Sequence, residues 1–152
     1  MPEHHNLFQK VSNNPHLLPH GIMINPKSIS IEKLQNLAWE IIEPEYFSTL
    51  DKLAEQFNQA KADGMGSDTM EEIGVAAAQG RVDTLILESD RIIPGRVNRE
   101  TGSIEAGDLE HPEIDDLLDD IGELVLQKGG NVMIVPVEKM ATFTGIAAIF
   151  RY

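Results

Sequence analysis

Three compact apolar runs constrain the fold of this chain more than any other feature of its sequence. They occupy residues 84–87, 132–135 and 146–150, and none of them alternates cleanly with polar residues. Strands that are apolar on both faces lie in the middle of a sheet with helices on both sides. The runs therefore predict an α/β fold, a three-layer α/β/α sandwich.

The segments between these runs predict how the strands connect. A helix is expected over 112–128, between the first and second runs, and a strand, a crossover helix and a further strand imply a parallel pair. Residues 138–145 are too few for a crossover, so the last strand should run antiparallel to its neighbour. The sheet is therefore mixed. A short strand over 91–97, interrupted by Pro94 and Gly95, is expected at an edge.

Helical patterns precede the first strand. From Ser30, apolar residues recur at the spacings of an amphipathic helix, and a stop is expected at Gly64. Pro44 either kinks this long helix or divides it into two, because proline lacks the amide hydrogen and clashes with the preceding turn. A second helix is expected over 68–79, with its first residue as the N-cap and a glycine just past its end.

The first 29 residues differ from the rest. They show no sustained period and contain three prolines and a turn-prone Ser-Asn-Asn-Pro run. They hold too many apolar residues for a freely solvated tail. We interpret residues 1–29 as an irregular arm or linker from a preceding domain, which packs on a neighbour, and residues 30–152 as one α/β/α domain.

Charge and composition exclude several classes of function. The chain has 12 Lys and Arg against 25 Asp and Glu, and its formal charge of −13 repels phosphate backbones and anionic lipid surfaces. It has no cysteine, so thiolate metal sites and cysteine nucleophiles are excluded. No apolar run approaches the roughly 18 residues of a membrane span. We expect a cytoplasmic protein without a membrane partner, for which nucleic acid is a disfavoured partner.

The acidic stretch 105–123 is the densest charge feature. Its four central aspartates are expected on the helix face opposite the leucines, where they are solvated and could recruit a basic partner. Two arginines near the Pro94–Gly95 loop form a second patch. Paired carboxylates can also bind a cation or act as acid and base, which keeps a small hydrolase as an alternative. The candidate partner-binding residues are Asp115, Asp116, Asp119, Asp120, Arg91 and Arg96.

Other chemistry-bearing motifs are absent from the sequence. Four of the five histidines lie in the arm, and no histidine pair is completed to a recognised zinc spacing. Neither a phosphate-binding loop of the Walker type nor a dinucleotide-binding glycine fingerprint occurs. No serine lies in a nucleophile-elbow context. We therefore expect no catalytic residue, no metal and no cofactor.

The second half of the chain resembles a known family of domains. The stretch GRVDTLILE at 80–88, the strand at 132–137 and the ending GIAAIFRY at 145–152 resemble the third, C-terminal domain of archaeal and eukaryotic class-1 peptide-chain release factors and of Pelota. Within that superfamily the chain resembles the bacterial archaeo-eukaryotic release factor family. Its segments EHHNLFQKVSNNP and AWEIIEPEY resemble the part of that family that joins the middle and last domains.

The resemblance implies a fold shared with kink-turn-binding ribosomal proteins. In the RNA-binding branch, a Gly-x-Asn-Glu stretch begins the helix that grips RNA, whereas this chain has Gly-Ser-Asp-Thr at 66–69. The peptidyl-tRNA hydrolysis motif Gly-Gly-Gln belongs to the middle domain of release factors, and Gly-Gly-Asn at 129–131 does not match it.

The last domain of release factors docks a translational GTPase. The resemblance therefore implies a non-catalytic protein-interaction domain, linked to translation termination or ribosome rescue. Its expected partner is a translational GTPase or a ribosomal component. A structured-RNA-binding domain of the ribosomal-protein type is the alternative that the shared fold leaves open.

Overall fold

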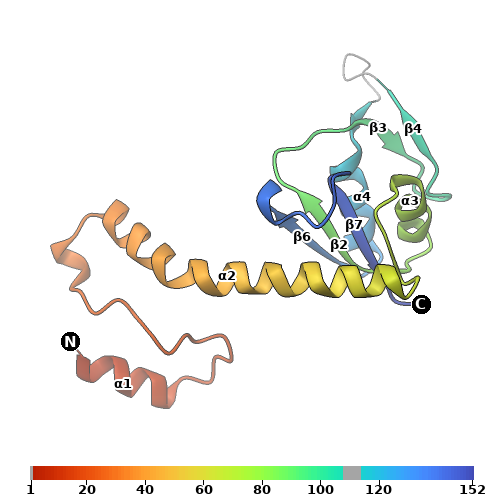
Figure 1. Cartoon of the computed structure of the whole chain (residues 1–152). Helices are drawn as coiled ribbons and strands as arrows, with labels where there is room; N and C mark the ends of the chain where they lie inside the picture. Colours follow the sequence, from red (N-terminus) through yellow and green to blue (C-terminus); the bar gives the residue numbers. More distant parts are fainter. Residues whose placement is uncertain (1, 108–113) are drawn as a thin grey trace. The chain divides into compact units, whose positions relative to one another are not determined.

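The computed structural model describes residues 2–107 and 114–152 (Figure 1). It divides into unit 1, Met1–Thr49, and unit 2, Leu50–Tyr152. Helix α2 (Ile31–Ala62) crosses this division. The domain boundary predicted at residue 30 stays a prediction.

Unit 1 is more helical than the sequence suggests. Helix α1 spans Pro2–Val11, and a short 3-10 helix, η1, spans Pro26–Ser28. The prediction of a wholly irregular arm is therefore wrong at its beginning. The sequence pattern does not indicate this helix because the helix is short and lies next to proline-rich, turn-forming sequence. Among residues 6–49, none is buried, so this described part of unit 1 has no core of its own.

Helix α2 begins as predicted. The hydroxyl of Ser30 accepts a hydrogen bond from the Lys33 amide at 3.2 Å, which caps the first turn. The helix continues through Pro44, so the alternative of two separate helices is wrong. It ends before Gly64, whose φ of +74° is accessible to glycine at little cost.

The main sheet of unit 2 has four strands in the order β1-β7-β2-β6. Strands β2 and β6 are parallel, with Leu85 opposite Val132, and β7 is antiparallel to both β2 and β1. The predicted parallel pair, the antiparallel last strand and the mixed sheet are all confirmed. The strands are β1 (Gly66–Ser67), β2 (Val82–Glu88), β6 (Asn131–Val135) and β7 (Ile146–Phe150).

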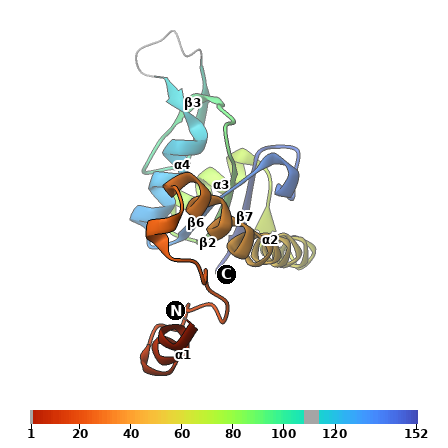
Figure 2. The same cartoon turned by 90° about the vertical axis from the view of Figure 1, so that its left-hand side faces the viewer.

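A second, smaller sheet lies between β2 and β6 in the sequence. It consists of β3 (Pro94–Val97), β4 (Ile104–Ala106) and β5 (Asp115–Asp116) in the order β4-β3-β5. Figure 2 shows β3 beside α4. Strand β3 is central, so its predicted edge position is wrong. Pro94 is the first residue of the strand, a position that proline occupies without breaking up the middle of a ladder.

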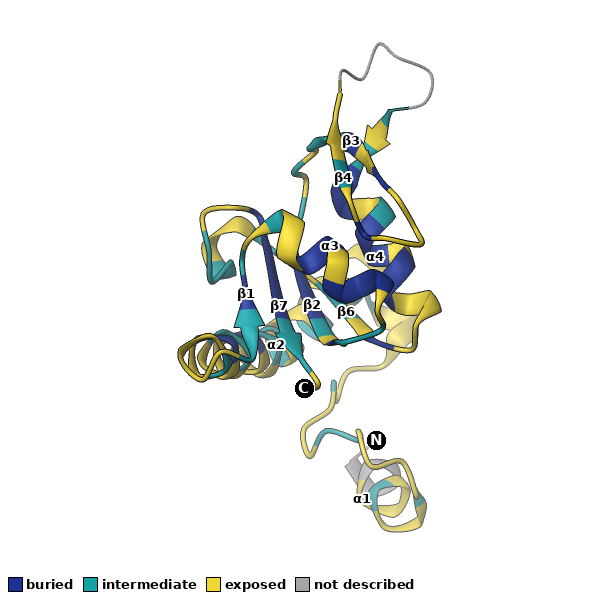
Figure 3. Cartoon of the chain, turned by 90° about the vertical axis from the view of Figure 1, so that its right-hand side faces the viewer, coloured by how far each residue is buried: buried dark blue, intermediate teal, exposed yellow. Residues whose placement is uncertain are grey.

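Helices α3 (Met70–Ala78) and α4 (Leu117–Gln127) supply most of the helical part of the core. Figure 3 shows the buried side of both helices turned towards the strands. The buried cluster includes Ile73, Leu85 and Ile121, each fully inaccessible. The removal of these apolar side chains from water stabilises unit 2.

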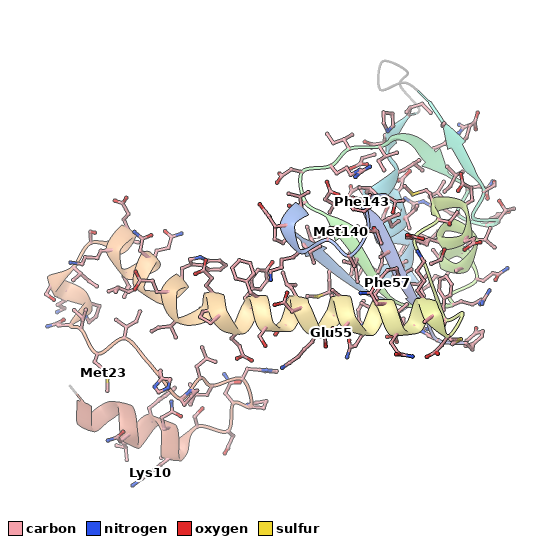
Figure 4. The ribbon with its side chains drawn as sticks, viewed as in Figure 1. Lys10, Met23, Glu55, Phe57, Met140 and Phe143 are labelled. Atoms are coloured by element: carbon pink, nitrogen blue, oxygen red, sulfur yellow. The ribbon has the colours of Figure 1, made fainter. Side chains whose placement is uncertain are left out.

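A second group of buried residues comes from the opposite side of the strands. Ile86 and Ala147 are paired in register, and alternation turns them away from the side chains of Leu85 and Ile146. Phe57 of α2 is only 1% exposed, and Figure 4 shows it on the part of the helix that belongs to unit 2. Helices over both faces, as in a three-layer sandwich, remain a prediction that these buried residues favour.

The beginnings of α3 and α4 differ from the predictions. The N-cap of α3 is Thr69, not Asp68, which instead forms an ion pair with Lys61 at 2.7 Å. Helix α4 begins at Leu117, after β5, rather than at 112. The predicted helical residues 112 and 113 lie outside the described residues.

Arg151, near the end of the chain, connects the ends of α3 and α4. The guanidinium of Arg151 donates hydrogen bonds to the carbonyl oxygens of Gly80, at 3.3 Å, and Gly129, at 2.5 Å. Both glycines lie just past a helix end and have positive φ, of +69° and +77°. A cation there satisfies carbonyls at the negative ends of the helix dipoles. Arg151 thus has a structural role.

Candidate functional site

A pocket of about 230 Å³ lies where the parallel strands β2 and β6 end and α4 begins. In open α/β sheets, the crevice outside the carboxyl ends of the strands is the usual place for binding. Three of its lining residues are apolar: Leu87, Leu118 and Ile134. The others form its polar rim, namely Glu88, Ser89, Asp90, Arg91, Asp116 and Asp119. We call this pocket the carboxyl-end pocket.

Arg91 connects this pocket to the loop before β7. Its Nη1 donates to Glu88 Oε2 and to the Phe143 carbonyl oxygen, both at 3.1 Å. The arginine side chain lies against Gly145, where an added Cβ would approach its Cδ to 2.3 Å. Arg91 therefore holds the backbone of this loop against the end of β2.

The loop that Arg91 holds exposes an aromatic side chain. Phe143 is fully exposed (Figure 4), although its carbonyl oxygen is fixed by Arg91. The hydroxyls of Thr142 and Thr144 both donate to the Ile146 carbonyl oxygen at 3.0 Å, which ties the same turn to β7. A large apolar side chain on a fixed backbone loses little conformational entropy when it contacts a partner.

Asp116 has a structural role in the pocket wall. Its Oδ1 accepts hydrogen bonds from the amides of Leu118, at 3.1 Å, and Ile93, at 3.0 Å. The first bond caps α4, and the second ties the helix to the segment before β3. Asp115 lies one position earlier, is exposed, and accepts a bond from the Asp116 amide.

The four predicted aspartates do not form one helical face. Asp115 and Asp116 precede α4, and only Asp119 and Asp120 lie within it. Asp119 is exposed and lines the carboxyl-end pocket, whereas Asp120 faces Arg99, whose nitrogen is 4.0 Å from its carboxylate. Burial raises the pKa of Asp120; Arg99 opposes the shift, and Asp115 adds to it. The expected acidic face is wrong because a short strand replaces the first helical turn.

The two predicted arginines lie in different places. Arg91 lines the carboxyl-end pocket, but Arg96 pairs across the small sheet with Glu105, its register partner, at 2.9 and 2.7 Å. Arg96 and Glu105 border a separate hollow of about 380 Å³. The structure therefore brings together Arg91, Asp116 and Asp119.

The sequence pattern does not predict several residues of this surface. It predicts Ile134 as a buried strand residue, but Ile134 is 62% exposed because β6 ends the sheet. Phe143 is not among the predicted site residues, although a lone aromatic between two threonines and before a glycine is a signal for an exposed turn. Strand order, which no local pattern specifies, determined the exposure of Ile134.

The carboxylates of the 105–123 stretch are not gathered in the described residues. Glu105 pairs with Arg96, and Glu123 pairs with Arg99. Asp108, Glu110 and Glu113 lie outside the described residues. Within residues 2–107 and 114–152, no group of three or more histidine or carboxylate side chains is arranged to hold a metal ion. No helix in the same ranges combines the length and apolar character needed to cross a membrane.

The stretch that corresponds to the RNA-gripping turn is engaged within the fold. Ser67 donates to the Glu72 carboxylate at 2.5 Å and accepts from the Thr69 amide at 3.1 Å. Asp68 is held by Lys61. The polar side chains of this turn therefore stabilise the entry to α3.

Comparison with known proteins shows what the chain is similar to. A family profile described as bacterial archaeo-eukaryotic release factor family 3 matches residues 1–81, just over half of the chain. No curated protein sequence matches.

Solved structures show the same fold. The C-terminal domain of a peptide chain release factor from Methanosarcina mazei is 18% identical with a TM-score of 0.61, and the match covers 86% of this chain and 98% of that one. A chain of ribosome-bound archaeal Pelota and ABCE1 is 16% identical with a TM-score of 0.54; the match covers 89% of this chain and 35% of that one. The mixed α/β fold of release-factor C-terminal domains is therefore confirmed.

Proposed function

Because the chain belongs to bacterial archaeo-eukaryotic release factor family 3, we propose that unit 2 is a non-catalytic protein-interaction domain of a release-factor-like protein. It acts in translation termination or ribosome rescue. Its partner is a protein of the translation machinery, a translational GTPase or a ribosomal component. The fold relates the chain to translation termination and ribosome rescue factors, which supports the proposed pathway.

One observation carries the proposal. At the carboxyl-end pocket, Arg91 and Asp116 are occupied by bonds that hold the scaffold, while Phe143 and Ile134 are exposed beside them. A binding surface needs fixed backbone and exposed apolar anchors, and this arrangement provides them.

The experiment measures binding of the full chain to purified translational GTPases and to purified bacterial ribosomes. Phe143→Ser should weaken binding to the partner roughly tenfold or more, the effect of removing an interface anchor. Leu126→Ser is the matched control, because Leu126 is 59% exposed on the last turns of α4, away from the pocket lining. It should leave the affinity within about twofold.

Two results would contradict the proposal. One is the absence of binding by the wild-type chain to every translational GTPase and to the ribosome. The other is hydrolysis of peptidyl-tRNA by the isolated chain at an enzyme-like rate. Retention of RNA alone by the chain would favour the structured-RNA alternative instead.

A further inference from the structure

Strand β6 forms one edge of the main sheet. Among the described strands it pairs with β2 alone, so its other side presents backbone amides and carbonyls without a neighbouring strand. The opposite edge, β1, has only two residues. Strand β6 has five, about 16 Å of extended backbone. It is therefore the edge that is long enough to pair with another segment.

The sequence of β6 does nothing to prevent pairing. Natural proteins protect edge strands with lysine, proline, a bulge or an inward-pointing charge. Strand β6 reads Asn-Val-Met-Ile-Val, with no charge and no proline inside it, and its five residues pair with β2 in unbroken register. Ile134 is 62% exposed, and Val132 and Met133 are only half-buried. An uncharged, apolar edge of this kind is typical of a strand that receives another strand.

The charge at the end of this edge is negative. Ile134 lines the carboxyl-end pocket with Asp90 and Asp119, both exposed. Arg91, which lines the same pocket, is held by Glu88 at 3.1 Å, and Lys139, which follows β6, is held by Asp51 at 2.6 Å. Unit 2 as a whole carries 20 of the 25 acidic residues and nine of the 12 basic ones.

We infer that the outer edge of β6 binds an extended segment of a partner protein, in which apolar and basic side chains alternate. This inference rests on the proposed function and names the chemistry of its partner. The segment adds a fifth strand to the sheet through backbone hydrogen bonds. Within the paired stretch its apolar side chains lie on the face of Ile134 and its basic side chains lie on the opposite face. Past the last residue of β6, where the segment leaves the pleat of the sheet, a basic side chain reaches Asp119 and Asp90. A second copy of this chain is a poorer occupant, because two strongly acidic units would repel each other.

The probe is the acetylated peptide KVKVKVK, mixed with the full chain. Amide hydrogen exchange is measured for each residue of β6 by nuclear magnetic resonance. Alternate amides of β6 should exchange freely in the free chain and become protected when the peptide binds, because alternate residues of an edge strand face outwards. The same peptide with alternate backbone amides N-methylated keeps its charge but cannot pair, and it should give no protection.

Variants of the chain locate the contact. Ile134→Lys places a lysine within the edge strand, where lysine discourages pairing, and should weaken peptide binding roughly tenfold or more. Val137→Lys is the matched control, since it makes the same charge change at a side chain that is 60% exposed in η2 (Val137–Lys139), outside the strand. It should change the affinity no more than about twofold.

Several outcomes overturn the inference. They are equal binding of the N-methylated peptide, equal weakening by Val137→Lys, protection of the β6 amides in the free chain, or a β6-mediated dimer in light scattering. The translational partner gives a separate result. If the wild-type chain binds a translational GTPase or ribosome and Ile134→Lys does not weaken that binding, the inference about β6 is wrong and the proposed function stands. If the peptide pairs with β6 but no translation component binds, the proposed function fails and the inference that β6 accepts a strand stands.

Discussion

Gly145→Ala tests whether Arg91 holds the loop that presents Phe143. Gly145 has a φ of +82°, and a non-glycine residue in this left-handed region costs about 1–2 kcal/mol. The new Cβ would also lie 2.3 Å from Arg91 Cδ. The arginine is flexible and can move, but it then loses its partly exposed hydrogen bonds to the Glu88 carboxylate and the Phe143 carbonyl oxygen, which contribute about 0–1 kcal/mol. The expected loss in free energy of unfolding is about 1–3 kcal/mol.

The assay is urea unfolding followed by far-ultraviolet circular dichroism, analysed at constant m-value. Gly64→Ala is the matched control, because Gly64 has a φ of +74° and nothing lies within 4 Å of the position its Cβ would take. It should show the backbone cost alone. Both changes are also made together with Arg91→Ala, which removes the group that the new Cβ meets.

The double variants decide the result. In the Arg91→Ala background, Gly145→Ala should cost no more than Gly64→Ala does. If its cost stays above that of Gly64→Ala when the arginine is absent, the clash lies elsewhere and Arg91 does not hold the loop. If Gly64→Ala does not lower the free energy of unfolding, the cost assigned to a non-glycine residue with positive φ is wrong as well.

Three further changes test other parts of the structure. Gly102→Ala should destabilise the chain more than Gly145→Ala does in the same urea assay. The new Cβ would lie 2.2 Å from the backbone oxygen of Gly74, and no side-chain rotation can relieve this contact. An equal or smaller loss in free energy of unfolding would contradict this close packing. Asp116→Ala should lower the free energy of unfolding by about 1–3 kcal/mol, because it removes the acceptor of two amide hydrogen bonds. Asp116→Asn keeps an acceptor and should lower it less. Equal losses would contradict the capping role. Asp120→Asn should stabilise the fold at neutral pH. Burial raises the pKa of this carboxyl above 3.8, so its ionised form favours the unfolded chain. The gain in stability should disappear as the pH falls below 3.8, and a gain that persists there would contradict the raised pKa.

The sheet was predictable because its strands are apolar on both faces. The runs at 84–87, 132–135 and 146–150 were identified as strands, and the length of the segments between them correctly predicted which pairs are parallel. The glycines after α2, α3 and α4 marked the helix ends for the same local reason, since each has a positive φ that other residues adopt with strain.

The small sheet was not predictable from local pattern. Strands β4 and β5 have only three and two residues, too few to show a period, and their pairing with β3 depends on the path of the chain between them. The same short strand, β5, displaced the predicted start of α4 and separated Asp115 and Asp116 from Asp119 and Asp120. Asp116 and Asp119 nevertheless line the carboxyl-end pocket together, and half of the predicted site residues lie outside it: Asp115, Asp120 and Arg96.

Most cations of unit 2 already have partners within the unit, which bears on the kind of partner that its surface can recognise. Seven of its nine Lys and Arg side chains bind carboxylates or backbone carbonyls within the unit: Lys61, Arg81, Arg91, Arg96, Arg99, Lys139 and Arg151. A phosphate group would have to replace one of these partners before it could be bound by such a cation, whereas exposed carboxylates such as Asp90 and Asp119 are already available to a positive side chain. Recognition by this unit should therefore favour a partner that supplies the basic residues itself.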